Sequence, residues 1–253
     1  MSILLHGDCL ELMKDIEDNS IDLIFCDLPY GQTSCKWDCP IDLQLFWIEV
    51  MRIKKLNTPI FFTTTTKFGV SLINSAPKKC FFRYDIVWIK SSAAGFLTAK
   101  KMPMRKHEMI YVFYEKLPFY DLSSHTNKFL KEGETIVNEE FTYKQDKEKD
   151  LYGTDIRKEV RTGKGVGKSS VYDPPLPTSM LEIKSTRGKH STEKPVELME
   201  WVLKYYSKKG DTVLDPTMGS GSTGIACKNM NRNFIGIEKD PEIYEVAINR
   251  LEE

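Results

Sequence analysis

The segment TVLDPTMGSGSTGIACKNMNRNFIGIEKD, residues 212–240, constrains the fold more strongly than any other part of the chain. Its apolar, β-branched opening, Thr212–Asp215, is typical of a strand, and it runs into a turn whose three glycines are spaced as G-x-G-x-x-G. The following residues predict a helix over Thr223–Met230 and a second strand over Asn233–Glu238. This order of strand, glycine turn, helix and strand predicts a nucleoside-binding unit of an α/β sheet.

The residues around the turn narrow the class of nucleoside. Gly219 and Gly221 allow a ligand to approach the backbone closely, and Glu238, 19 residues after the first glycine, can accept hydrogen bonds from ribose hydroxyls. In a dinucleotide fold the helix N-terminus is left free for a pyrophosphate, whereas here Asp215-Pro-Thr-Met precedes the first glycine. A carboxylate at Asp215 would repel a pyrophosphate and suits an ammonium group, which favours S-adenosylmethionine over NAD.

Strands and helices alternate along much of the chain, which predicts a mainly parallel sheet with helices on both faces. The expected strands are Ile3–His6, Ile21–Asp27, Thr58–Thr65, Arg83–Lys90, Met109–Glu115, Thr212–Asp215 and Asn233–Glu238. The expected helices are Cys9–Ile16, Leu43–Leu56, Pro195–Tyr206, Thr223–Met230 and Pro241–Leu251, the last capped by Asp240. Residues 1–115 and 188–253 therefore form one domain, and the polar stretch 116–187 is expected to be an inserted subdomain, since structureless loops of that length are rare.

A second informative stretch is IDLIFCDLPYG, residues 21–31, a buried strand that ends in Asp27-Leu28-Pro29-Tyr30. Proline leaves the sheet ladder and restricts the residue before it, so the chain turns stiffly there. One acid, one backbone carbonyl and one aromatic ring then face the same space. The same sequence is equally compatible with a plain strand-to-turn exit in which Asp27 is solvated. Because ligands of open α/β sheets lie at the carboxyl ends of the strands, this stretch and the glycine turn should face one crevice.

Composition excludes several classes of protein. No apolar run approaches the roughly 20 residues of a membrane helix, and Asp8 and Glu11 interrupt the short apolar start, which argues against a signal peptide. The six cysteines (9, 26, 35, 39, 80 and 227) include no C-x-x-C pair, so reduced thiols in a cytoplasmic protein are expected and no metal site. Charge is balanced, 36 cationic against 36 acidic residues, but five cations and no acid occupy residues 90–106.

The two stretches together resemble the DNA amino-methyltransferases. DLPYG is similar to the D-P-P-Y motif of that family, and LDPTMGSGSTG is similar to its S-adenosylmethionine motif. Their order, catalytic motif first and cofactor motif last, resembles the circularly permuted β group, as does HSTEKPVELMEW at residues 190–201. The resemblance implies a Rossmann-like seven-stranded sheet, with residues 116–187 as the target-recognition region. Leu28 stands where the family usually has its first proline, and its backbone carbonyl can still serve the same role.

The resemblance also implies roles for single residues. The Asp27 carboxylate and the Leu28 carbonyl would hold the hydrogens of an exocyclic amine, next to Pro29, and Tyr30 would stack on a base flipped out of double-stranded DNA. Tyr30 as a core residue, Asp8 as a plain helix cap, and surface roles for His190 and Lys194 remain open. The cofactor residues implied are Asp8, Asp27, His190, Lys194, Asp215, Gly219, Gly221, Thr223 and Glu238. The candidate DNA contacts are Lys100, Lys101, Arg105, Lys106, Arg161, Lys164 and Lys168.

Several alternatives stay open from sequence. Aspartate at position 27 favours adenine N6 as the methyl acceptor, since family members acting on cytosine N4 more often begin the motif with serine. Cytosine N4 is therefore the second reading, and RNA or a protein amide would use the same chemistry. A catalytically silent nucleic-acid-binding module is the alternative from another class. A homodimer and a cognate restriction enzyme are further expectations from the resemblance, and the expected location is the cytoplasm, on the nucleoid of a prokaryote or in the host cell of a virus.

Overall fold

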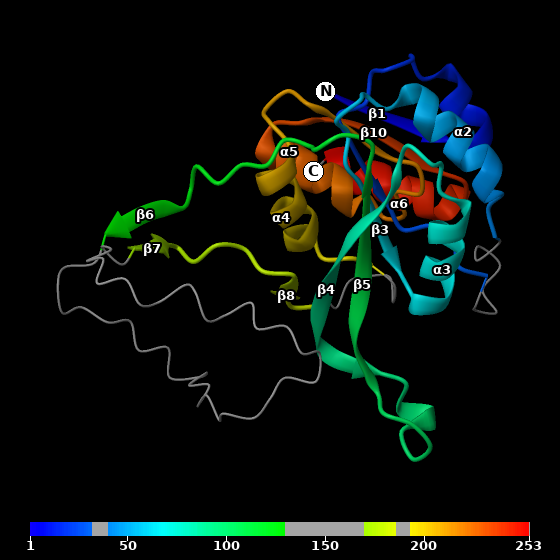
Figure 1. The fold of residues 1–253 in the computed structure, drawn as a ribbon. Helices are drawn as coiled ribbons and strands as arrows, with labels where there is room; N and C mark the ends of the chain where they lie inside the picture. Colours follow the sequence, from blue (N-terminus) through cyan, green and yellow to red (C-terminus); the bar gives the residue numbers. More distant parts are fainter. Residues whose placement is uncertain (32–39, 130–169, 186–192, 253) are drawn as a thin grey trace. The chain divides into compact units, whose positions relative to one another are not determined.

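The computed structural model describes residues 1–31, 40–129, 170–185 and 193–252, and it contains two compact units (Figure 1). The larger unit combines Met1–Asp121 with Thr178–Glu253, and the smaller unit is Leu122–Pro177. Two segments distant in sequence thus build one body around the expected sheet. The described part of the smaller unit contains the antiparallel pair β6 (Thr126–Phe129) and β7 (Ser170–Asp173). A target-recognition role for the inserted segment stays a prediction.

The larger unit is organised around an eight-stranded sheet in the order β1-β10-β9-β2-β3-β5-β4-β8. All seven expected strands are in it, and the short β8 adds an eighth at the edge beside β4. Only β5 runs antiparallel to its neighbours β3 and β4, so the mainly parallel α/β class is confirmed. The strands are β1 (Ser2–His6), β2 (Leu23–Cys26), β3 (Ile60–Thr64), β4 (Phe81–Ala94), β5 (Arg105–Tyr114), β8 (Met180–Glu182), β9 (Thr212–Asp215) and β10 (Asn233–Glu238).

Helices cover both faces of the sheet, as the alternation of buried residues on β3 demonstrates. Successive residues of a strand point to opposite faces. Phe62 packs against Trp47 of α2, with ring centroids 5.6 Å apart, whereas its neighbour Phe61 packs against Tyr206 of α4 at 5.0 Å. The helices are α1 (Cys9–Leu12), α2 (Leu43–Ile53), α3 (Thr66–Ser75), α4 (Val196–Tyr206), α5 (Ser222–Met230) and α6 (Pro241–Glu252), with short 3₁₀ turns η1 (Met13–Asp15) and η2 (Phe96–Thr98).

The helices depart from the sequence prediction in three places. The helix expected over Cys9–Ile16 is α1 followed by η1, and α2 ends at Ile53 because Lys54 is extended. Helix α3 was not predicted, since Gly69 lies in its middle and weakens the helical pattern. A Cβ on Gly69 would lie 2.3 Å from the Tyr111 ring, so close packing on the sheet explains the glycine. The predicted Asp240 cap is confirmed, because its carboxylate accepts hydrogen bonds from the amides of Glu242 and Ile243.

The expectations about membrane helices and cysteines can be compared with the described residues. No helix among them is long and apolar enough to cross a membrane. Cys9, Cys26, Cys80 and Cys227 are buried free thiols, and Cys35 and Cys39 lie outside the described residues.

Candidate active site

Asp27 lies just past the end of β2, and its carboxylate accepts three hydrogen bonds. The Tyr30 hydroxyl donates to Oδ1 at 2.8 Å, and the hydroxyl of Thr63 on β3 donates to the same oxygen. Lys194 Nζ donates to Oδ2 at 2.6 Å. The Asp27 side chain retains 30% exposure, so a held and oriented carboxylate still faces outward. The plain strand exit with a solvated acid does not describe this geometry.

Lys194 is the centre of a partly buried charge cluster. Its side chain is 12% exposed, and its ammonium lies 2.6 Å from Asp27 Oδ2 and 3.6 Å from Glu108 Oε2. The other Glu108 oxygen accepts a hydrogen bond from Lys90 at 2.6 Å. Burial acts to lower the pKa of Lys194, but the two carboxylates outweigh it and raise the pKa above its ordinary value. Lys194 is therefore a permanent cation behind Asp27, and a surface role for it is wrong.

Leu28 and Tyr30 shape the turn after Asp27. The Leu28 side chain is 2% exposed and belongs to the main apolar cluster, so it packs in the core. The Tyr30 ring lies 5.2 Å from the Phe68 ring, and its hydroxyl is tied to Asp27. Burial, reinforced by the nearby Asp27 charge, raises the pKa of Tyr30, so the phenol stays protonated and acts as a donor.

The glycine turn is held by two acids at the ends of neighbouring strands. Asp215, at the end of β9, accepts hydrogen bonds from the Thr223 hydroxyl at 2.6 Å and from the Thr217 amide at 3.2 Å. Glu238, at the end of β10, accepts from the Gly219 amide at 3.0 Å. Gly219 and Gly221 have φ values of +52° and +83°, which favour glycine. The turn is thus fixed in shape by its own backbone and by these carboxylates.

Both predicted stretches line one pocket. Asp27 and Lys194 line it together with Asp215, Thr217 and Gly219. The remaining lining residues are Phe25, Glu193, Met199, Met218, Ser220, Ser222, Thr223 and Ile243. The Thr217 hydroxyl is buried and has no hydrogen-bond partner among the described residues, so it is available to a polar ligand. The pocket thus offers carboxylates that accept hydrogen bonds and a free hydroxyl. These groups fit a cofactor that carries an ammonium group and sugar hydroxyls.

Asp215 makes the stability of the ligand-free protein depend on pH. Burial raises the pKa of Asp215 to about 7 from its ordinary 3.8, and the nearby acids add to the effect. The folded protein therefore binds the proton more tightly than the unfolded chain does. Its contribution to stability is complete below pH 4 and is lost as pH rises through 7.

We expect the free energy of unfolding of the wild type to fall, relative to that of Asp215→Asn, by up to about 4 kcal/mol between pH 4 and pH 8. Asparagine cannot ionise, so the difference between the two proteins isolates this one group. Urea unfolding of both at several pH values measures it. A difference that does not change with pH would contradict the raised pKa.

The other predicted residues divide into three groups. Asp8 caps α1 through the amide of Leu10 and pairs with Lys239 at 2.9 Å, so the helix-cap reading holds and a cofactor role stays a prediction. Lys100, Lys101, Arg105 and Lys106 lie together on the exposed β4–β5 hairpin, away from the pocket lining. Four predicted residues lie outside the described part of the chain: Arg161, Lys164, Lys168 and His190.

Sequence reasoning missed several residues that the fold brings to the site. Thr63 lies in the strand expected over Thr58–Thr65 and Glu108 lies one residue before the strand expected over Met109–Glu115, and neither was given a role. Thr217 was passed over inside the glycine stretch. Glu193 accepts a hydrogen bond from Arg250 at 2.8 Å, and the same guanidinium binds the Ser220 carbonyl. The sequence signal that could have indicated Glu193 is its position beside Lys194, directly before a predicted helix.

The fold and the paired acids at adjacent strand ends fit a Rossmann-like methyltransferase. Comparisons with known proteins identify the family to which it belongs. The family model described as DNA methylase, for N6 and N4 methyltransferases, matches residues 21–249. The chain is 29% identical to the type II methyltransferase M.HinfI of Haemophilus influenzae, and the alignment covers 100% of this chain and 69% of M.HinfI. It is also 29% identical to M2.DpnII of Streptococcus pneumoniae, over 99% and 89% of the two chains.

Solved structures agree on the fold. The M1.HpyAVI–SAM complex aligns with a TM-score of 0.61 at 21% identity, over 99% of this chain and 100% of that one. The PvuII DNA methyltransferase, titled cytosine-N4-specific, aligns with a TM-score of 0.66 at 15% identity, over 98% and 86%. The chain belongs to the N6/N4 DNA methylase family and is an S-adenosylmethionine-dependent DNA methyltransferase.

Proposed function

We propose that the enzyme methylates the N6 amine of an adenine flipped out of double-stranded DNA. The observation that carries the proposal is the Asp27 carboxylate, which lines the same pocket as the Asp215 and glycine-turn cofactor residues and is fixed by three donors. Aspartate at the head of this motif favours adenine within the family. Type II relatives such as M.HinfI and M2.DpnII support site-specific methylation of DNA.

A count of acceptor sites supports binding of the amine at Asp27. An ionised carboxylate offers about four lone-pair sites, and Tyr30, Thr63 and Lys194 occupy three of them. The remaining site, on Oδ2, can accept one amine hydrogen, and the Leu28 carbonyl can accept the other. Both acceptors draw the nitrogen lone pair out of conjugation with the ring and direct it outward. Acceptors fixed in advance cost no reorganisation as charge develops on the nitrogen.

Tyr30 is suited to hold the flipped base. Its hydroxyl is tied to Asp27 and its ring is braced by Phe68, so the ring is oriented before the base arrives. Stacking of a base on such a ring contributes about 1–3 kcal/mol. The tether also fixes the distance between the stacking surface and the acceptor carboxylate.

The cofactor is proposed to lie beside the glycine turn of the same pocket. S-adenosylmethionine supplies an electrophilic methyl group on a sulfonium. Asp215 can pair with its ammonium group, Thr217 and the Gly219 turn can contact the methionine portion, and Glu238 can accept from the ribose hydroxyls. Thr223 lines the same pocket, and its hydroxyl donates to Asp215, so it can hold that carboxylate in place beside the methionine portion.

Nucleoside mass spectrometry tests the proposal. The protein is expressed in a host that lacks DNA methyltransferases, and the digested host DNA is compared with that of cells expressing Asp27→Ala. We expect N6-methyladenine only with the wild type. N4-methylcytosine would keep the mechanism and overturn the base, and the PvuII enzyme shows that this fold accommodates that substrate. Neither mark, from protein that binds S-adenosylmethionine, would overturn DNA as the substrate. A homodimer and a cognate restriction enzyme rest on resemblance alone.

A further inference from the structure

The strands β4 and β5 continue past the sheet as a two-stranded hairpin, which we call the arm (residues 91–107; Figure 1). Every residue of the arm is exposed. Ile89 is the last residue of β4 that pairs with β8, and Ala94 pairs with Arg105 beyond a register shift. On β5 the step from Met109 to Arg105 is four residues, or about 13 Å at 3.3 Å per residue, and the tip lies beyond it.

The arm leaves the sheet on the side of the active site. Met109 of β5 pairs with Thr64 at the carboxyl end of β3, next to Thr63, which donates to Asp27. Glu108, the next residue toward the arm, contacts Lys194 behind the same carboxylate. The root of the arm is thus continuous with the catalytic cluster, and a substrate at Asp27 lies near the start of the arm.

The arm carries positive charge and no negative charge. Its four cations are Lys100, Lys101, Arg105 and Lys106, and none of them has an ion-pair partner among the described residues. Lys90 at the root differs, since Glu108 neutralises it. Cations without partners on a narrow ribbon are complementary to DNA phosphates, and a two-stranded β-ribbon fits the major groove of a duplex.

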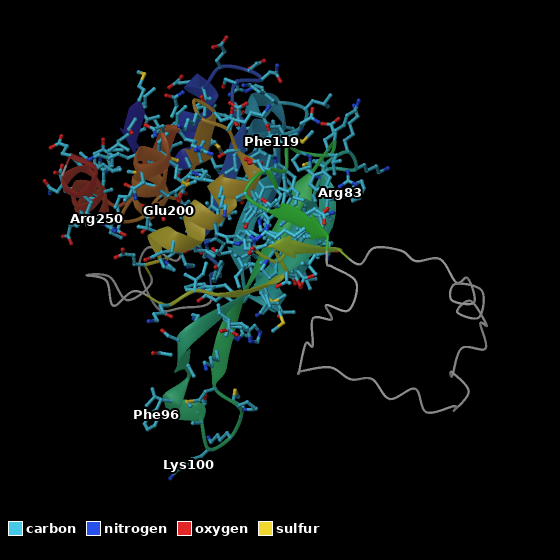
Figure 2. All side chains as sticks on the ribbon, turned by 90° about the vertical axis from the view of Figure 1, so that its left-hand side faces the viewer. Arg83, Phe96, Lys100, Phe119, Glu200 and Arg250 are labelled. Carbon is cyan, nitrogen blue, oxygen red and sulfur yellow. The ribbon has the colours of Figure 1, made fainter. Side chains whose placement is uncertain are left out.

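The tip of the arm is apolar where solvent would favour polar residues. Phe96 (Figure 2) and Leu97 are 82% and 99% exposed, and Met102 and Met104 are exposed in the loop just before β5. Gly95, with φ of +94°, turns the chain so that the two large side chains stand at the end of the hairpin. Large apolar side chains at such a position are the kind that enter and unstack base steps.

We propose that the arm is a DNA-insertion element, in which the four cations hold the phosphates and Phe96 and Leu97 enter the base stack opened when the target base is extruded. The inference rests on the proposed function and adds a part of the molecule that helps to open the duplex. Charge complementarity selects DNA over a second copy of this chain, since two arms of equal charge repel each other.

The first test reads insertion without requiring methylation. Tryptophan at the tip, Phe96→Trp, is expected to lose fluorescence when sheared DNA from the methyltransferase-deficient host is added, because an indole stacked on bases is quenched. The matched control is Leu117→Trp, an exposed apolar site beyond the other end of β5. Unchanged emission from both variants under conditions where DNA binds would overturn insertion, whether or not the enzyme methylates DNA.

The second test separates opening of the duplex from simple binding. The substrates are a duplex with the motif found methylated in the host and the same duplex with an abasic site opposite the target base. For Phe96→Ala/Leu97→Ala we expect kcat/KM to fall at least about tenfold on the paired duplex and less than about threefold on the other, since an unpaired base is cheaper to extrude. Leu117→Ala should change neither. An equal loss on both duplexes, or a wild-type dimer that the tip variant converts to monomer, would overturn the proposal.

Discussion

Replacing Asp27 with asparagine is expected to reduce methyl transfer by about 10²–10³-fold, the cost of removing one preorganised electrostatic group from a transition state. Asparagine keeps the shape but presents a weaker, neutral acceptor to the amine. It also leaves the Lys194 ammonium with Glu108 at 3.6 Å as its remaining carboxylate. Single-turnover methylation of a duplex substrate measures the rate. Asp27→Ala should reduce transfer further, to the background measured without enzyme.

The affinity for S-adenosylmethionine separates this effect from a general loss of structure. Asp215 and Glu238 are unchanged in the variant, so the dissociation constant measured by calorimetry should stay within a few fold. Asp22→Asn is the matched control, because Asp22 precedes the same strand and pairs with Lys55 at the far end from the site. Retained turnover in Asp27→Asn would remove Asp27 from the proposed role.

The strand pattern of the larger unit follows from sequence because each strand is a short apolar run between turn signals. Thr212–Asp215 and Asn233–Glu238 match β9 and β10 residue for residue. The extension of β4 and β5 into the arm does not follow in the same way. Residues 91–94 read Ser-Ser-Ala-Ala, and small residues have little preference for strands, so cross-strand pairing rather than local preference extends the hairpin.

The active site was predictable only where its residues are adjacent in sequence. Asp27, Leu28 and Tyr30 form one motif, and the glycine turn forms another. Lys194 reaches Asp27 across 167 residues of chain, and no local pattern marks that contact. Lys194 was placed by resemblance along the cofactor, whereas the structure pairs its ammonium with the acid of the catalytic motif. Contacts of this kind depend on which strands become neighbours, and therefore on the completed sheet.

Replacing Lys194 with methionine is expected to impair both folding and catalysis. The ammonium lies between the carboxylates of Asp27 and Glu108, and methionine fills similar space without the charge. Because both carboxylates are partly exposed, removing the cation should lower the free energy of unfolding by about 1–3 kcal/mol, less than for a fully buried pair. With the cation gone, the two acids are left without the charge they share, and Asp27 Oδ2 loses the donor that orients it. A carboxylate that is less well oriented toward the amine should slow methyl transfer by about 10²-fold.

A second substitution distinguishes this electrostatic role from a packing role. In Lys194→Met, two like charges share one site without their common cation. Adding Glu108→Gln removes the repulsion, so the double variant should recover about tenfold of the lost single-turnover rate. Glu108→Gln alone leaves Lys194 on Asp27 and should change the rate less than about threefold. If the double variant is no faster than Lys194→Met, repulsion between Asp27 and Glu108 is not the cause, and Lys194 acts through packing alone.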